Sequence, residues 1–150
     1  MVKKGCPGAK LYIAGWNANK YLGRYLPLPD VAIDENISHP EIFFSQIAVM
    51  TYTPAQGSGM KVKVMESMAY GVPVVTTPDG VEGIECINGY HCWVAEKDDA
   101  IAEKIIALLG DIEARRRMAG AARGLLEDKY SPLPVVDQMM DVYKEVITRG

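Results

Sequence analysis

The stretch from Gly57 to Val75 constrains this chain most strongly, because it joins a glycine-rich turn, a helix start and a buried-strand signal. Gly57 and Gly59 let the backbone approach a ligand closely. The helix expected next, from about Met60 to Tyr70, leaves its first N–H groups without partners inside the helix and carries partial positive charge at that end. The combination predicts an anion site whose natural ligand is a phosphate.

The chain has the size and composition of one compact domain over residues 1–150. Its 150 residues are 49% hydrophobic and 23% charged. The formal net charge of -3 argues against nucleic acid as the main partner, since such binding normally requires a basic excess. No apolar run reaches membrane-spanning length and the N-terminus lacks the apolar stretch of a signal peptide, so the sequence predicts a cytoplasmic protein.

The cysteines are an odd set without close pairing in the sequence: Cys6, Cys86 and Cys92. This pattern predicts a reducing compartment and no disulfide framework. Cys86, His91 and Cys92 cluster, but their spacing matches no common zinc pattern, so we interpret them as buried or strand-edge residues and expect no metal. His39 and His91 are the only histidines, and each is interpreted as a loop or edge residue, with a general base as the alternative.

Short apolar segments alternate with helical patterns along the chain, which predicts a Rossmann-like α/β domain of three layers around a parallel sheet. Ligands of such sheets bind beyond the carboxyl ends of the strands, where the loop 53–59 must lie. The expected strands are 11–14, 31–34, 47–52, 73–77 and 92–95. The expected helices are a weak one in 17–26, a short one at 40–45, and longer ones at 60–70, 98–109 (capped by Asp98 or Asp99), 112–130 and 135–149. The last of these makes 132–150 a terminal helical segment.

The helix over 60–70 places Lys63 and Glu66 together on its polar face. One interpretation is a surface ion pair that contributes a few tenths of a kcal/mol. The other is a nucleoside diphosphate site, in which Glu66 accepts hydrogen bonds from a sugar diol and the helix amides hold the phosphates. Lys61 lies in the first turn, where its long side chain can reach past the helix end toward an anion.

Standard phosphate motifs fit this loop less well. The Walker pattern requires Gly-Lys-Ser/Thr at the end of the loop, and the dinucleotide fingerprint requires a third glycine and a later acidic residue. None of these is present here, which leaves a nucleotide sugar as the ligand class.

The sequence resembles the C-terminal, donor-binding domain of the retaining family 4 glycosyltransferases, also called glycosyl transferase group 1, which have the two-domain GT-B fold. The most specific part of the resemblance is the run from Glu66 to Val75. Further segments that resemble the family are 7–15, 57–59, 63–65, 82–84, 88–89 and parts of the helical tail.

The resemblance implies transfer of a sugar from a nucleotide diphosphate sugar to an acceptor, with retention of configuration and without a metal cofactor. It implies that Glu66 holds the donor ribose and that the base lies near Asn36 and Ile37. The donor diphosphate would be held by Gly57, Ser58, Gly59, Met60, Lys61, Val62 and Lys63.

The chain departs from the family pattern in two places. Many members carry a glutamate that contacts sugar hydroxyls where this chain has Ser58, which cannot supply a charge-assisted hydrogen bond. The family's N-terminal acceptor domain, and the strand and helix that precede the segment matching 7–15, are also missing. We therefore expect a fragment or a stand-alone half that is inactive in isolation and whose terminal helix lacks its usual partner.

Two alternatives remain open at this stage. The chain could be a non-catalytic nucleotide-binding or regulatory Rossmann-like module; a phosphorylation receiver is less compatible, because no acidic pair accompanies a first strand. The basic run from Arg115 to Arg117 is interpreted as a solvated helix face, with contact to a membrane surface as the alternative.

Overall fold

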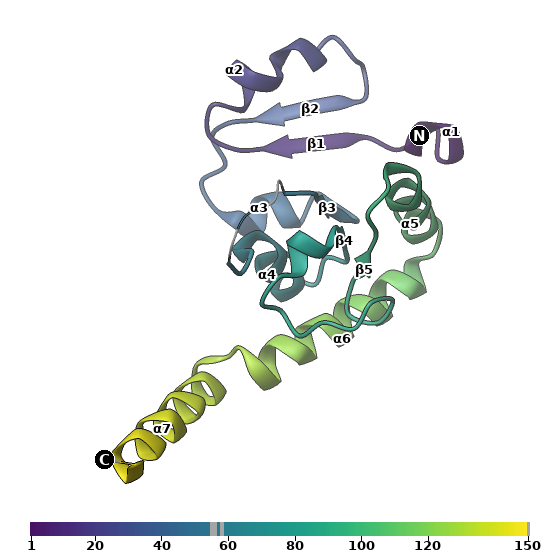
Figure 1. Ribbon diagram of the computed structural model, residues 1–150. Helices are drawn as coiled ribbons and strands as arrows, with labels where there is room; N and C mark the ends of the chain where they lie inside the picture. Colours follow the sequence, from purple (N-terminus) through teal and green to yellow (C-terminus); the bar gives the residue numbers. More distant parts are fainter. Residues whose placement is uncertain (55–56, 58, 150) are drawn as a thin grey trace.

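The computed structural model describes residues 1–54, 57 and 59–149, and its elements alternate between strands and helices (Figure 1). The strands are β1 (Leu11–Ala14), β2 (Val31–Asp34), β3 (Met50–Tyr52), β4 (Val74–Thr76) and β5 (Trp93–Val94). The helices are α1 (Val2–Gly5), α2 (Ala18–Leu22), α3 (Pro40–Phe44), α4 (Val62–Ala69), α5 (Asp98–Gly110), α6 (Ile112–Lys129) and α7 (Pro132–Arg149), with 3-10 turns η1 (Gly23–Tyr25) and η2 (Pro78–Val81).

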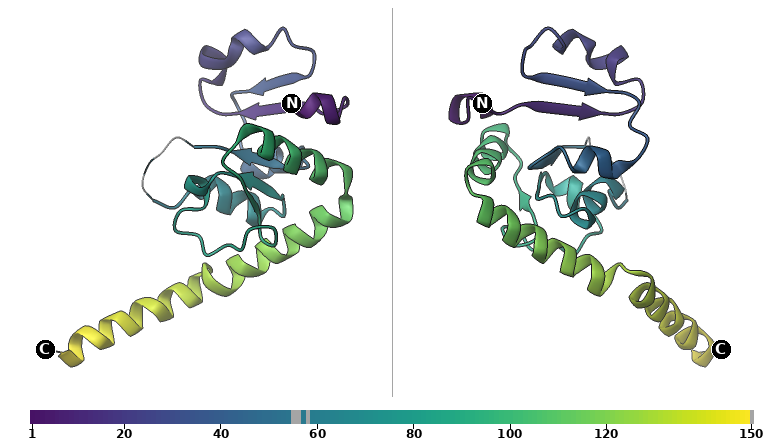
Figure 2. Two further views of the ribbon diagram at one scale, coloured as in Figure 1. Left: turned by 45° about the vertical axis from the view of Figure 1, so that its right-hand side comes forward. Right: turned by 180° about the vertical axis from the view of Figure 1, so that it is seen from behind.

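Every paired strand is parallel to its neighbour, which confirms the predicted α/β class. The pairing differs from the expected single sheet, however. Among the described strands, β1 pairs with β2 in one sheet, and β3, β4 and β5 form another in that order. Figures 1 and 2 show the β1–β2 pair to one side of the larger sheet in every view.

The central strand β4 carries the core on both of its faces, because all three of its residues are fully buried. Val74 belongs to a hydrophobic cluster with side chains from α4 and α6, whereas Val75 belongs to a second cluster with side chains from α5 and α6. A strand that is apolar on both faces requires cover on each side. This arrangement gives the helix, sheet and helix layers that the sequence predicts.

Two sets of contacts hold the β1–β2 pair against the larger unit. Tyr12 of β1 lies 5.4 Å from Phe43 between ring centroids, and Phe44 stacks on Tyr70 at 4.9 Å. At the other end, α1 packs on α5. None of the described helices combines the length and apolar character needed to cross a membrane.

Several predicted boundaries are corrected by the structure. β3 begins at Met50 and not at Ile47, and α7 begins at Pro132, because proline fits the first turn of a helix. Asp98 and Asp99 lie in the first turn of α5, and Lys97 occupies the N-cap position that we expected an aspartate to fill. The short helix α1 was not predicted.

Candidate functional site

The loops that follow β3 and β4 meet at the start of α4. The ammonium group of Lys61 donates hydrogen bonds to the carbonyl oxygens of Gly57 (2.9 Å) and Gly59 (2.7 Å), both in the loop after β3. It also forms an ion pair with Glu82 Oε2 at 3.3 Å, in the loop after β4. β3 and β4 are adjacent and parallel, so one lysine joins the two loops at the carboxyl edge of the sheet.

This geometry differs from the predicted role of the Lys61 side chain. We expected it to reach past the helix end toward a bound anion. Instead the side chain is only 12% exposed and makes three interactions, as many as the donors of an ammonium group. Lys61 therefore positions the loops that form the helix start.

The helix start itself lies two residues later than predicted. Lys61 has an extended backbone and is the N-cap of α4, and its carbonyl oxygen accepts the first intrahelical bond from the N–H of Val64 (2.9 Å). The residues before the helix form a turn in which Gly59 has a φ of +93°, a conformation that favours glycine. Met60 is therefore in the turn and not in the helix.

The start of α4 is open to solvent. Val62 is 63% exposed, and Lys63 and Gly59 are also exposed. No acidic residue lies in the first turn of α4, so no carboxylate there opposes an incoming anion. Ser58, which belongs to the predicted phosphate loop, lies outside the described residues.

Glu66 lines a hollow of about 460 Å³ between α4 and the end of α6. Its side chain is half-buried, and within the described residues no ion pair joins it to Lys63, as the surface-pair interpretation would require. Glu66 therefore borders a hollow that also reaches Val62 in the first turn of α4. The other lining residues are Val62, Met65, Ala69, Arg123, Leu126, Glu127, Tyr130 and Ser131.

The predicted base-binding residues, Asn36 and Ile37, lie in the loop that follows β2, at the carboxyl end of the β1–β2 sheet. The N–H of Asn36 donates to Asp34 Oδ1 (3.0 Å), and Asn36 is exposed whereas Ile37 is half-buried. Within the described part of the chain, no hydrogen bond connects this loop to α4. The structure thus brings Gly57, Gly59 and Lys61 together but leaves the base-binding prediction without a direct link to them.

Tyr130 at the end of α6 is a site-supporting residue that the sequence reasoning missed. Its hydroxyl accepts a hydrogen bond from the N–H of Glu85 (2.8 Å) and donates one to the carbonyl of Gly83 (3.3 Å). These bonds hold the segment that directly follows Glu82, the partner of Lys61. The sequence did contain a signal for this contact, because the run Glu82-Gly-Ile84 is one of the segments that resemble the family, although no role was inferred for it.

The sulfur atoms of Cys86 and Cys92 lie 3.1 Å apart, although six positions separate them in the sequence. The Nδ1 atom of His91 accepts a hydrogen bond from the N–H of Ile87 (2.9 Å), so this nitrogen is engaged within the loop. Burial lowers the pKa of His91 below its ordinary value. Within the described ranges, no three His, Cys, Asp or Glu side chains gather as a metal site.

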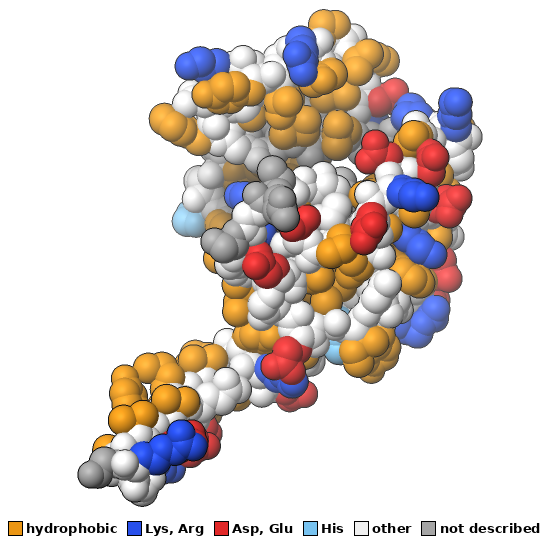
Figure 3. Space-filling model, viewed as in Figure 1, with side chains coloured by type: hydrophobic (Ala, Val, Ile, Leu, Met, Phe, Trp, Pro, Cys, Tyr) orange, Lys and Arg blue, Asp and Glu red, His pale blue; other side chains and the backbone are white. Residues whose placement is uncertain are grey.

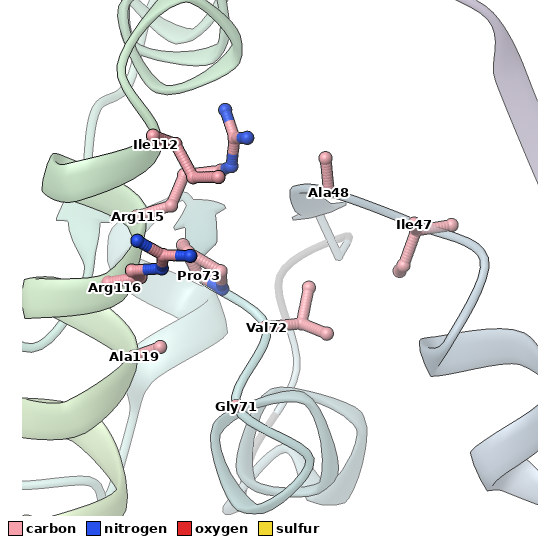
Figure 4. Close-up of a pocket in the computed structure, with 9 residues that line it drawn as sticks. All are labelled: Ile47, Ala48, Gly71, Val72, Pro73, Ile112, Arg115, Arg116 and Ala119. Carbon is pink, nitrogen blue, oxygen red and sulfur yellow. The ribbon is translucent and has the colours of Figure 1, made fainter.

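A second hollow, of about 410 Å³, lies at the opposite edge of the sheet (Figure 4). It is lined by Ala48 ahead of β3 and Pro73 ahead of β4, so it opens at the amino ends of these strands. Arg115 and Arg116 also line it, but Arg115 donates to the last carbonyls of α5 and Arg116 pairs with Glu113 at 2.7 Å. Ligands of parallel sheets bind at the carboxyl edge, so this hollow is separate from the candidate site.

A double-mutant cycle on Lys61→Met and Glu82→Gln is expected to give a coupling energy of about 0.5–1 kcal/mol. This value is at the upper end of the range found for partly exposed ion pairs. The reason is that Lys61 is mostly buried and its ammonium is also held by two carbonyl groups. Urea denaturation of the four proteins measures the coupling. The exposed α6 pair Arg116 and Glu113 is the control, with an expected coupling of at most a few tenths of a kcal/mol. Equal coupling in the two pairs would contradict the positioning role of Lys61.

The family of the chain follows from comparison with known proteins. The sequence profile described as glycosyl transferases group 1 matches residues 1–111. The chain belongs to this family. The capsular polysaccharide biosynthesis glycosyltransferase CapM of Staphylococcus aureus is 30% identical over 119 residues, covering 77% of this chain and 30% of CapM. The chain spans 30% and 38% of the lengths of the curated relatives that it matches, about a third.

Solved structures place the fold within GT-B glycosyltransferases. A mutant of S. aureus TarM, in complex with fondaparinux, alpha-GlcNAc-glycerol and UDP, aligns with a TM-score of 0.80 at 17% identity, covering 95% of this chain and 30% of TarM. The C-terminal domain of the group 1 family protein LpcC from Francisella tularensis aligns with a TM-score of 0.71 at 18% identity, covering 87% of this chain and 74% of that one. The chain therefore has the fold of a C-terminal group 1 glycosyltransferase domain.

Proposed function

We propose that this chain binds the nucleoside diphosphate of a nucleotide-sugar donor and forms the donor half of a retaining glycosyltransferase. Membership of the group 1 family supports sugar transfer by the parent protein. The complex of TarM with UDP supports a nucleoside diphosphate as the ligand class, because TarM has the same fold.

One observation carries the proposal: the start of α4 is exposed and sits at the carboxyl edge of the sheet, in loops joined by Lys61. N–H groups at a helix start bind anions, and the helix dipole favours negative charge there. Breaking the bond between sugar and diphosphate leaves charge on the diphosphate, which preorganised amides and the Lys63 ammonium stabilise without a metal ion. The proposed diphosphate site comprises Gly57, Ser58, Gly59, Met60, Lys61, Val62 and Lys63.

Glu66 is proposed to hold the ribose. It lies one turn into α4 and lines the hollow beside the helix start, where a carboxylate can accept hydrogen bonds from vicinal hydroxyls. The base is proposed to lie near Asn36 and Ile37, in the exposed loop after β2. In this arrangement the diphosphate of the nucleotide lies at the start of α4 and its base lies beside the β1–β2 sheet.

Two surfaces support a second, acceptor-binding domain as the partner of this chain. α7 has no buried residue and extends away from the remainder of the fold (Figures 1 and 2). An apolar stripe along α7 is exposed, and Figure 3 shows apolar side chains gathered on this helix. The stripe comprises Leu133, Val136, Met140, Tyr143 and Ile147.

The second surface is formed by strand edges. β1 and β3 each have one edge without a strand partner among the described residues, so a strand from outside 1–150 could join the two sheets.

Glu66→Ala is expected to raise the Kd for the nucleoside diphosphate roughly 5- to 150-fold, through loss of about 1–3 kcal/mol of charge-assisted hydrogen bonding. Isothermal titration with uridine, guanosine and adenosine diphosphates measures the affinity and identifies the base. Lys63→Ala is expected to weaken binding of the nucleoside diphosphates but to leave binding of the free nucleosides unchanged, because the Lys63 ammonium interacts with the phosphates.

Matched controls are available on surfaces away from the site. Glu103→Ala removes an exposed carboxylate of α5, and Lys10→Ala removes an exposed ammonium ahead of β1. Both are expected to leave the affinity unchanged. Equal effects of Glu66→Ala and Glu103→Ala would remove Glu66 from the site. Absence of heat with all three diphosphates would favour the alternative of a non-catalytic module that does not bind nucleotides.

A further inference from the structure

Cys86 and Cys92 form a pair of sulfur atoms in direct contact, at 3.1 Å, outside the proposed donor site. Cys92 is fully buried in the core cluster that includes side chains of α4. Cys86 is partly exposed. One sulfur is therefore open to a small reagent from solvent, and the other can be reached only from its partner.

The loop between these cysteines is closed by its own hydrogen bonds. The Asn88 side chain accepts the N–H of Val94 (2.9 Å) and donates to the Val94 carbonyl (3.3 Å). Gly89 has a φ of +81° and donates its N–H to the Cys92 carbonyl (2.7 Å). These contacts keep the ends of the loop together, so bringing the two sulfurs to bonding distance requires little further ordering of the chain.

We propose that Cys86 and Cys92 are the site of a reversible intramolecular disulfide, formed by exchange with a low-molecular-weight disulfide such as oxidised glutathione. The pair would then be reduced again by thiols. Cys6, the remaining cysteine, lies next to α1 and has no role in this exchange.

The exchange has two balanced steps. The Cys86 thiolate attacks one sulfur of oxidised glutathione, forming a mixed disulfide and releasing one glutathione thiolate. The Cys92 sulfur then attacks the Cys86 sulfur as its proton passes to the departing glutathione sulfur, which forms the internal disulfide and releases the second glutathione as a thiol. Two protein thiols are oxidised and one glutathione disulfide is reduced to two thiols.

The electrostatics of the pair favour this order of events. The Cys92 thiol donates a hydrogen bond to the Cys86 sulfur, which lowers the pKa of Cys86 to about 7. The same hydrogen bond, together with burial, raises the pKa of Cys92. A substantial fraction of Cys86 is therefore thiolate near neutral pH, whereas Cys92 stays protonated until Cys86 has reacted.

The test equilibrates the full chain with mixtures of reduced and oxidised glutathione, followed by acid quenching, alkylation and intact mass spectrometry. The proposal predicts that alkylatable thiols fall from three to one, with a mass loss of two hydrogens before alkylation and no glutathione adduct. The oxidised protein is expected to melt about 5 °C higher, because the bond closes a short loop of the unfolded chain. Three remaining thiols, or a stable glutathione adduct on Cys86 of the unsubstituted protein, would overturn the proposal.

Variants make the result specific to this pair. Cys6→Ser is expected to show the same mass loss and to end with no free thiol. Cys92→Ala is expected to stop at the mixed disulfide, with one glutathione held on Cys86. If Cys92→Ala instead lost two hydrogens, Cys86 would have paired with Cys6. That result would overturn the assignment of Cys92 as the partner of Cys86.

Discussion

Replacing Met68 with alanine is expected to lower the free energy of unfolding by about 2–5 kcal/mol. Met68 is fully buried on the inner face of α4, in the cluster that contains Val74 of β4 and Leu125 of α6. Removing its side chain leaves a cavity where three elements meet, since the surrounding backbone can relax only in part. Chemical denaturation followed by circular dichroism measures the loss.

Met139→Ala is the matched control for this substitution. Met139 is 51% exposed on α7, which has no buried residue, so the same chemical change is expected to alter the free energy of unfolding by less than about 0.5 kcal/mol. A loss at Met68 no larger than at Met139 would show that α4 is not anchored by this cluster. The candidate site would then lack its rigid support.

Gly80→Ala is expected to lower the free energy of unfolding by about 1–3 kcal/mol, because it overpacks a buried position. A Cβ at Gly80 would lie 1.8 Å from Thr76 Oγ1 and 3.0 Å from Thr76 Cβ. Thr76 is fully buried at the end of β4, and its hydroxyl donates to the carbonyl of Tyr52 at the end of β3. Relief of the clash by rotating Thr76 would break that bond between the strand ends.

Gly120→Ala provides the opposite expectation within the same protein. A Cβ at Gly120 meets open space on α6, so alanine is expected to stabilise the helix by about 0.5–1 kcal/mol. Thermal denaturation of both variants tests the sign of each change. Similar stability changes for Gly80→Ala and Gly120→Ala would contradict the close approach of η2 to β4.

The helix at the centre of the site shows why its end was predictable and its start was not. α4 ends where Gly71, with a φ of +72°, donates its N–H to Met68 (3.1 Å) and Val72 donates to Ser67 (2.9 Å). That termination depends on a glycine within the same segment, so the sequence reveals it. The start has Lys61 at its N-cap without a side-chain capping bond, so no capping residue marks it in the sequence, and the loop before it is tied to Glu82, which is far along the chain.

The same distinction explains the other outcomes. The parallel α/β architecture follows from apolar segments that alternate with helical ones, which is a local signal. The division into two sheets, and the contact between Cys86 and Cys92, depend on how distant or looped segments meet in space. Glu66 could be selected from its helical position alone, but the apolar hollow beside it includes α6 residues that no spacing rule connects to α4.

In the proposed function, backbone amides at the start of α4 bind the diphosphate, and an NMR titration that follows the amide chemical shifts tests this binding. With a saturating nucleoside diphosphate, we expect the largest shifts on Gly59, Met60, Lys61, Val62 and Lys63. The free nucleoside should leave these five amides nearly unchanged. Diphosphate-dependent shifts confined to the hollow at the amino ends of β3 and β4, with the start of α4 unaffected, would show that α4 is not the diphosphate site.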